Sequence, residues 1–302
     1  MTEAGIIVLN YNTFTDSVAC VDSIIKNTRS GLKYRIYLID NASPDRSGMK
    51  LAELYRSSDI VQVICLDVNG GFSVGNNAGI GMALGDGCQF LFLLNSDIII
   101  ENDAISLMAE KLKSDDTIAA IGPAVFDRNG SYTQFARKAL TYGTHLMERF
   151  PFLSDRKVRR YAYDSTEEYI FDGMSAGCCF GMNAAYLGEL DDRIFMYYEE
   201  DILAHKMKLI DKKACVLPSA RVVHNEGVAT KKSVIGKASF EKMYRWTSAM
   251  YVLKEYAGAS RSQMLFLRFV NILEWKILSL FQKEYKDREL QFRELVEKYS
   301  RE

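Results

Sequence analysis

Two apolar runs in this chain contain a polar side chain that could bind a metal or take part in a reaction. Asp97 interrupts the run that begins at Phe90, and His224 ends the last run that is predicted to be a strand. An isolated buried carboxylate is costly, so we expect Asp97 at a strand end, beside a cation, a metal or a hydrogen-bond donor. An ordinary turn explains Asp97 about as well as a functional site does. A histidine at a strand end is more often a hydrogen-bonded structural residue than a ligand. Carboxylate and imidazole together nevertheless form a pair of ligands that binds Mn²⁺.

The acidic triplet Glu199, Glu200 and Asp201 follows the aromatic stretch 195–198. Neighbouring carboxylates repel one another and an apolar wall raises a carboxyl pKa, which suits a general base that works near neutral pH. Acidic residues also favour a helix N-terminus, and the residues after Asp201 have a helical pattern. The two interpretations are compatible, so the triplet is predicted to begin a helix and to contain a candidate base.

The elements that must position these residues alternate along the first part of the chain. Strand-like runs at 6–9, 34–39 and 60–66 are each followed by a polar turn and a helical segment. This alternation, followed by the run at 90–100, predicts an α/β fold with a mixed, mostly parallel sheet and flanking helices. Ligands of such sheets bind at the carboxyl ends of the strands, which is where Asp97 is expected.

The glycine-rich segment 69–79 matches neither the dinucleotide fingerprint nor a P-loop. Glycines let backbone N–H groups approach a phosphate, and a helix N-terminus favours an anion. A plain loop with tight turns explains the segment equally well, and Asn76 and Asn77 then act as helix caps.

Residues 127–170 are rich in arginine and aromatic side chains and have no clear periodicity. Such a segment is either a loop over a site or an exposed insertion, and the sequence does not distinguish the two. The small residues within 171–182 indicate a strand that another backbone or a ligand approaches closely.

Composition excludes several classes of protein. The chain has 302 residues, 48% of them hydrophobic, and a net charge of -1, so it can bury a full core and lacks the basic field that holds nucleic acid. The six cysteines show no zinc or disulfide spacing, which favours reduced thiols in the cytoplasm. No secretion signal precedes the first strand, and no stretch has the ~18 uninterrupted apolar residues of a membrane-spanning helix.

The pattern changes after residue 236. A helical segment with one apolar face begins at Phe240 and is interrupted at 258–260. The next segment, 264–281, is a helix that is apolar nearly all round, and the charged tail that follows is also predicted to be helical. We therefore expect a larger α/β domain at 1–235 and a C-terminal helical extension at 236–302. Helices like 264–281 usually pack on their own domain or in a homodimer; peripheral contact with the inner face of the cell membrane is the alternative.

Seven short motifs occur in a characteristic order, at 7–12, 39–43, 69–77, 94–97, 175–177 and 195–200, and at His224 with Gly227. In this order the chain resembles the family 2 glycosyltransferases, and more narrowly the bacterial rhamnosyltransferases that extend surface polysaccharides. The resemblance covers roughly residues 5–230.

The resemblance implies a GT-A fold, a nucleotide-sugar donor, a glycan or lipid-linked acceptor, Mn²⁺ or Mg²⁺, and inversion at the anomeric carbon. Asp97 would bind the metal, His224 the metal or the diphosphate, and Glu200 would accept the acceptor's proton. Residues 10–12 would line the base pocket, and Asp40 would hydrogen-bond the nucleobase. The implied donor-binding residues are Asn10, Tyr11, Asn12, Asp40, Asn69, Gly71, Phe72, Asn76, Asn77, Asn95 and Ser96.

Two positions depart from the family pattern. Asn95 stands where many relatives have an acid, which leaves the metal one carboxylate short. Glu200 replaces the usual Asp and reaches one methylene further, so Glu199 and Glu200 are both candidates for the base. Two other functions fit less well: a sugar nucleotidyltransferase, whose basic glycine-rich signature is missing at 7–12, and a non-catalytic nucleotide-sugar binding module.

Overall fold

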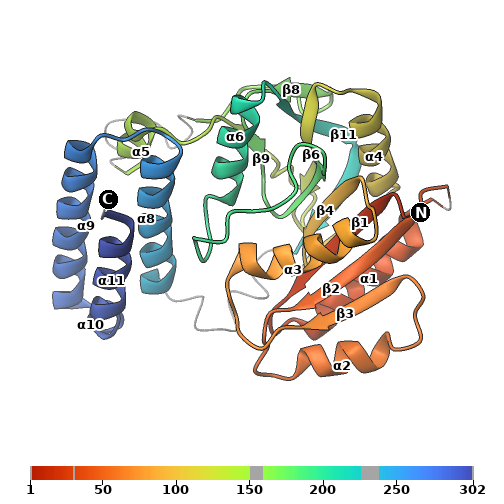
Figure 1. The fold of residues 1–302 in the computed structure, drawn as a ribbon, viewed down its shortest axis with the longest axis horizontal. Helices are drawn as coiled ribbons and strands as arrows, with labels where there is room; N and C mark the ends of the chain where they lie inside the picture. Colours follow the sequence, from red (N-terminus) through yellow and green to blue (C-terminus); the bar gives the residue numbers. More distant parts are fainter. Residues whose placement is uncertain (1, 30, 150–158, 226–237, 301–302) are drawn as a thin grey trace.

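The computed structural model describes residues 2–29, 31–149, 159–225 and 238–300, which form a large sheet flanked by helices and a group of helices beside it (Figure 1). The strands are β1 Ala4–Asn10, β2 Tyr34–Asp40, β3 Val61–Cys65, β4 Phe90–Asn95, β5 Ile98–Ile100, β6 Ile118–Phe126, β7 Ala136–Arg137, β8 Tyr169–Phe171, β9 Met174–Ser175, β10 Cys179–Asn183 and β11 Lys213–His224. The helices are α1 Phe14–Asn27, α2 Ser47–Leu54, α3 Phe72–Gly85, α4 Ala104–Ser114, α5 Tyr142–Arg149, α6 Glu199–Leu209, α8 Ala238–Glu255, α9 Arg261–Phe281, α10 Lys283–Asp287 and α11 Glu289–Ser300.

Across the described residues, the main sheet has nine strands in the order β3-β2-β1-β4-β10-β6-β11-β5, with β8 paired to β11. Strands β3, β2, β1 and β4 are parallel. Strand β10 is antiparallel to both β4 and β6, and β11 is parallel to β6, so β6 and β11 share the direction of the first four. The predicted mixed, mostly parallel sheet is therefore confirmed.

Both faces of the sheet are covered by helices. Ile6 and Val8 belong to one buried cluster with side chains of α1, α2 and α4, whereas Ile7 belongs to the opposite cluster with α3 and α6 (Figure 1). Successive residues of a strand point to opposite faces, so a strand covered on both sides needs apolar residues at every position. This explains the unbroken apolar sequence of β4.

The C-terminal helices form a third cluster around the buried Trp275, whose ring stacks on Phe292 with centroids 4.0 Å apart. Leu140, Ile194 and Ile202 belong to the same cluster, so the helices share a core with the part of the chain that carries the sheet. The predicted domain boundary at 235 lies outside the described residues and stays a prediction. Among the described helices, none is long and apolar enough to cross a membrane.

Strand β6 runs through Gly122 and Pro123 to Phe126. Pro123 is the register partner of Leu217, next to an irregularity in the pairing of β6 with β11, and proline is tolerated in strands at such irregularities. The apolar run at 90–100 forms two strands, and the second, β5, pairs with β11 at the far end of the sheet.

Candidate active site

The sheet register brings three predicted donor-binding residues to one edge. Asn10 and Asp40 are partners at the ends of β1 and β2, and Asn95 ends β4 opposite Leu9. Because parallel strands end on the same side of a sheet, these polar residues meet although they are separated along the chain.

A buried hydrogen-bond network joins this edge. The Asn10 amide donates to Asp40 Oδ1 at 2.5 Å and to Ser47 Oγ at 2.9 Å. Asn10 Oδ1 accepts a hydrogen bond from Thr13 Oγ1 at 2.9 Å, and Thr13 Oγ1 lies 2.7 Å from Ser96 Oγ. Asn10, Asp40 and Ser96 are thus brought together, but the carboxylate of Asp40 is buried and already satisfied from within the protein.

The segment after β1 lies against the loop after β2. Asn12 has a left-handed φ of 59° and donates its backbone N–H to Ser43 Oγ at 2.9 Å. A left-handed non-glycine residue costs free energy and is concentrated at functional sites. Tyr11 next to it is half-buried. Both residues lie beside the Asn10 network, and their role at the nucleobase stays a prediction.

The glycine-rich loop is attached to the segment that carries the acidic triplet. Gly71 has a φ of 93°, and a Cβ there would lie 2.0 Å from the Phe195 carbonyl oxygen. The Phe72 N–H donates to that same oxygen at 2.8 Å. Asn69 Oδ1 accepts from the Gly71 N–H at 3.0 Å and holds the turn. Position 71 therefore requires glycine for both its conformation and its close contact.

The two asparagines at the start of α3 have different surroundings. Asn76 donates to the Phe72 carbonyl at 2.9 Å, and its Oδ1 is buried without a partner within the described residues. Both the amide nitrogen and the amide oxygen of Asn77 are hydrogen-bonded to the Leu190 backbone, each at 2.9 Å. The structure thus places Asn77 as an anchor of the 190 segment.

Asp97 and His224 meet because β5 pairs with β11. His224 is the register partner of Ile98, and its Nε2 lies 3.3 Å from Asp97 Oδ1. Burial lowers the pKa of His224, but hydrogen bonds with Asp97 and Cys178 outweigh burial and raise that pKa to about 10. Gly227, predicted to accompany His224, lies outside the described residues.

The spacing of Asp97 and His224 fits a divalent ion that is shared with a substrate, and such an ion would have to displace the proton that the raised pKa leaves on His224. Adjacent ligands of an octahedral ion with bonds of about 2.1 Å lie about 3 Å apart, close to the observed separation. Among the described residues, no group of three or more His, Cys, Asp and Glu side chains could hold a metal. Mg²⁺ and similar ions usually bind to one or two carboxylates together with substrate phosphates, and not in a complete protein cage.

The acidic triplet begins α6, as the helix-start interpretation predicts, and also faces a cavity. Tyr197 and Tyr198 have left-handed φ values of 72° and 74°, which turn the chain into the helix. Glu199 is buried, and burial followed by the charge of Glu200 raises its pKa to about 8. Glu200 is more accessible and lies 3.3 Å from Arg137.

The third acid, Asp201, has a different role. It is buried, and its carboxylate accepts the Leu140 N–H at 2.7 Å and forms ion pairs with Arg137 at 3.1 Å and with the buried Arg159. Neither arginine is predicted from the sequence to belong to the site. The richness of 127–170 in arginine was the only signal, because nothing local indicates that Arg137 and Arg159 reach the start of α6.

One cavity of about 540 Å³, a volume typical of a small-molecule site, lies between the start of α3, the end of β4 and the start of α6; Asp97 and His224 do not line it. Its lining includes Phe72 and Asn95 from the donor side, Cys178, and the two glutamates Glu199 and Glu200. Cys178 lies between the two parts, since its carbonyl accepts the Asn95 N–H at 2.9 Å and its side chain is hydrogen-bonded to His224.

The mixed, mostly parallel sheet with its flanking helices has the architecture of a GT-A fold. The fold is similar to the crystal structure of GalNAc-T7 with UDP, GalNAc and Mn²⁺, with a TM-score of 0.58 and 17% identity over 98% of this chain and 55% of that one.

The family follows from the sequence: residues 5–195 match Glycosyl transferase family 2, and the chain belongs to that family. It is also 28% identical over 118 residues to "Glycosyltransferase GlyG" of Streptococcus pneumoniae serotype 4 (strain ATCC BAA-334 / TIGR4). That match covers 39% of this chain and 38% of the relative, so it spans well under half of either protein. The narrower resemblance to rhamnosyltransferases stays a prediction.

Proposed function

We propose that the protein is a metal-dependent, inverting glycosyltransferase of bacterial surface polysaccharide synthesis. It moves a sugar from a nucleotide-sugar donor to a hydroxyl of a glycan or lipid-linked acceptor. One observation carries the proposal: the Asp97–His224 pair and Glu200 are joined through Cys178 and Gly177, because a Cβ at Gly177 would lie 1.9 Å from Glu200 Oε1.

The proposed reaction is a direct displacement. The acceptor hydroxyl oxygen forms a bond to the anomeric carbon while the bond from that carbon to the diphosphate oxygen breaks, and the hydroxyl proton passes to Glu200. Mn²⁺ or Mg²⁺ at Asp97 and His224 would supply positive charge to the departing diphosphate. Arg137, 3.3 Å from Glu200, fixes the position of its carboxylate.

Glu200 is preferred to Glu199 as the base. Glu199 is 6% exposed, so an acceptor hydroxyl has less access to its carboxylate than to that of Glu200. Its Oε1 is also buried without a hydrogen-bond partner in the described part of the chain. Glu200 is the more accessible of the two and has Arg137 as a counter-charge.

The donor site is tested by calorimetric titration of UDP-, GDP- and dTDP-sugars with and without Mn²⁺. Asp97→Ala should remove the Mn²⁺-dependent part of the affinity, whereas Asp59→Ala, at an exposed position, should leave it intact. An unchanged Mn²⁺ dependence in Asp97→Ala contradicts the proposal. Turnover of nucleoside triphosphate with sugar phosphate would instead indicate a nucleotidyltransferase, and nucleotide-sugar binding with no turnover would indicate a binding module.

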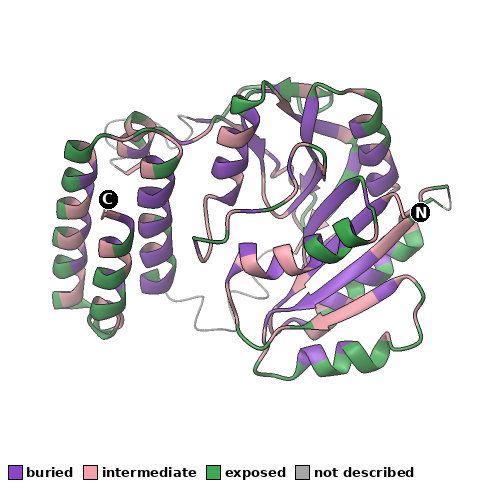
Figure 2. Cartoon of the chain, viewed as in Figure 1, coloured by how far each residue is buried: buried purple, intermediate pink, exposed green. Residues whose placement is uncertain are grey.

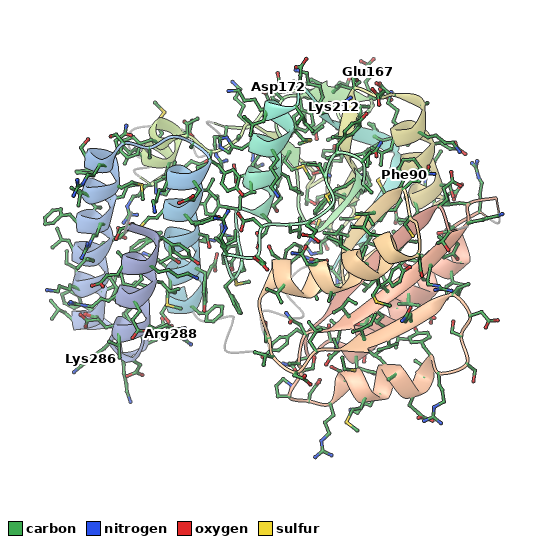
Figure 3. The ribbon with its side chains drawn as sticks, viewed as in Figure 1. Phe90, Glu167, Asp172, Lys212, Lys286 and Arg288 are labelled. Carbon is green, nitrogen blue, oxygen red and sulfur yellow. The ribbon has the colours of Figure 1, made fainter. Side chains whose placement is uncertain are left out.

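The C-terminal helices suggest where the enzyme works. Helix α9 buries one side against α8 and α11 and exposes the other (Figure 2). The exposed apolar side chains of α9 are Leu265, Phe266, Phe269, Leu273, Ile277, Leu280 and Phe281. The fully exposed charges of α9 are Arg261 and Lys276, both positive, and Lys286 and Arg288 lie at one end of this group of helices (Figure 3). An apolar face with basic residues is suited to an anionic lipid surface, so we propose peripheral attachment at the cytoplasmic face of the membrane.

A further inference from the structure

Four arginines line the cavity, and two of them are neutralised by acids of the site. Arg137 pairs with Glu200 at 3.3 Å and with Asp201 at 3.1 Å. The buried Arg159 pairs with Asp201 and, at 2.7 Å, with Glu148. The charge of both arginines is used to hold the acids in place, so neither is available to a ligand.

Arg160 and Arg245 are in a different situation. The Arg160 guanidinium lies over the Phe135 ring at 4.8 Å, and no carboxylate partner for it occurs in the described part of the chain. Arg245 lies over the Tyr197 ring at 4.4 Å, and its partner Glu241 is an exposed residue one turn away on the same helix. Exposed pairs of this kind contribute little, so both guanidinium groups retain positive charge and free N–H donors.

A chain of contacts leads from the Asp97–His224 pair past Glu200 to Arg160, and Arg245 lines the same cavity. The His224 side chain is hydrogen-bonded to Cys178, and Gly177, which precedes Cys178 in the chain, lies against Glu200. Glu200 pairs with Arg137, whose guanidinium lies 5.4 Å from the Phe135 ring that also carries Arg160. The donor diphosphate belongs at the metal pair, so a ligand at Arg160 is on the acceptor side of the base.

We propose that Arg160 and Arg245 bind a phosphate or diphosphate group carried by the acceptor. The proposal rests on the proposed function, because it defines which substrate occupies this side of the cavity. Guanidinium groups match phosphate oxygens in a two-pronged geometry, and a phosphate has charge and oxygens enough for two arginines, whereas a sugar carboxylate offers one charge. The cavity of about 540 Å³ has room for a sugar next to such a group.

The test is a titration of the full chain with four small probes, while Mn²⁺ and a nucleoside diphosphate saturate the donor side. The probes are a hexose 1-phosphate, an alkyl hexosyl diphosphate, a methyl hexuronide and a neutral methyl hexoside. Both phosphate probes should bind more tightly than the uronide and the neutral glycoside. Arg160→Gln and Arg245→Gln should each weaken the phosphate probes about tenfold or more, as expected for a lost hydrogen bond to a charged group.

Each variant has a matched control in the chain. Arg221 lies over the Phe126 ring at 4.3 Å, as Arg160 lies over Phe135, and Arg293 pairs with Glu289 one turn away, as Arg245 pairs with Glu241. Arg221→Gln and Arg293→Gln should leave phosphate binding unchanged. Equal binding of phosphate and uronide probes, or an equal loss in the control variants, overturns the proposal.

The experiment also separates this proposal from the proposed function. Asp97 does not line the cavity, so Asp97→Ala should lose Mn²⁺-dependent nucleotide binding, whereas Arg160→Gln should keep that nucleotide binding and lose affinity for the phosphate probes. If no nucleotide-sugar binds the wild type, the proposed function fails while the phosphate titration still gives its own result. Tighter binding of the alkyl diphosphate than of the hexose 1-phosphate identifies a lipid-linked source of the phosphate, and equal binding identifies a free glycosyl phosphate.

Discussion

Glu199 and Glu200 are adjacent in the chain but have different surroundings, and substitution should separate their roles. Loss of a general base typically costs about 10²–10⁴-fold in rate. Glu200→Gln should therefore lower kcat by about that factor and keep donor affinity, whereas Glu199→Gln should stay active. Initial rates and donor titrations with both variants check this; a dead Glu199→Gln beside an active Glu200→Gln would reverse the assignment.

Glu199 also makes a prediction for stability against pH. Its folded pKa of about 8 lies above the ordinary value of 4.5, so between these pH values the folded state holds more protons than the unfolded state. Wild-type stability should therefore fall as pH rises through this window. Glu199→Gln removes this pH dependence. The melting temperature of the variant minus that of the wild type should therefore increase from pH 5 to pH 8. A constant difference between the two melting curves would contradict the assigned pKa.

Gly177 limits the position of the Glu200 carboxylate. A Cβ there would lie 1.9 Å from Glu200 Oε1, which is the mobile end of a side chain. Gly177→Ala should therefore displace the carboxylate, lower kcat tenfold or more by mispositioning the base, and change the melting temperature little. Gly81→Ala, where a Cβ meets nothing within 4 Å, is the control that should leave kcat unchanged. Full activity of Gly177→Ala would show that Glu200 is not held at this point.

At the scale of elements, the segment before α6 is fastened to α8 through Asp191. Its carboxylate accepts hydrogen bonds from Tyr251 at 2.6 Å and Tyr256 at 2.5 Å and pairs with Arg193 at 2.8 Å. Burial raises the pKa of Asp191, but the hydrogen bonds outweigh burial and lower it well below its usual value. The carboxylate thus connects the site segment to the C-terminal helices.

Asp191→Asn should cost about 1–3 kcal/mol, since bonds to a charged acceptor are lost. The contribution of a depressed carboxyl pKa is complete above the unfolded value near 3.8 and disappears as the pH falls below it, so the variant and the wild type should converge in acid. Denaturant unfolding at pH 7 and pH 3 measures this. The exposed neighbour Asp192→Asn is the control, and an equal loss in both variants would exclude the proposed connection.

The existence of the elements was easier to predict from the sequence than their pairing in space. Local apolar patterns predict strands β1, β2 and β4 and helices α8 and α9, because each pattern reflects how one segment is buried. The insertion of β10 between β4 and β6 and the pairing of β5 with β11 depend on residues far apart in sequence, so no local pattern reports them. The same reason explains why the residues alone left the pairing of Asp97 with His224 open until the family resemblance was considered, and why Arg137 and Arg159 received no role.

At the scale of the whole molecule, the exposed face of α9 should decide where the protein is found. Leu280 and Leu290 are 80% and 72% exposed, but Leu290 belongs to α11 and not to α9. Leu280→Glu should weaken binding to anionic vesicles about tenfold or more, by loss of apolar burial and by repulsion, whereas Leu290→Glu should not. Co-sedimentation at rising salt measures this. A dimer that persists in high salt and ignores vesicles would assign the face to a second copy.

The contact of Gly71 and Phe72 with the Phe195 carbonyl has a kinetic consequence. The loop that is expected to meet the donor phosphates and the segment that carries the base share one backbone hydrogen bond of 2.8 Å, so neither can shift alone. Binding of the donor should therefore fix the conformation of the acceptor side. The two substrates should then add in a fixed order, in which the donor binds first and the nucleoside diphosphate leaves last. Nucleoside diphosphate should then inhibit competitively against the donor and non-competitively against the acceptor.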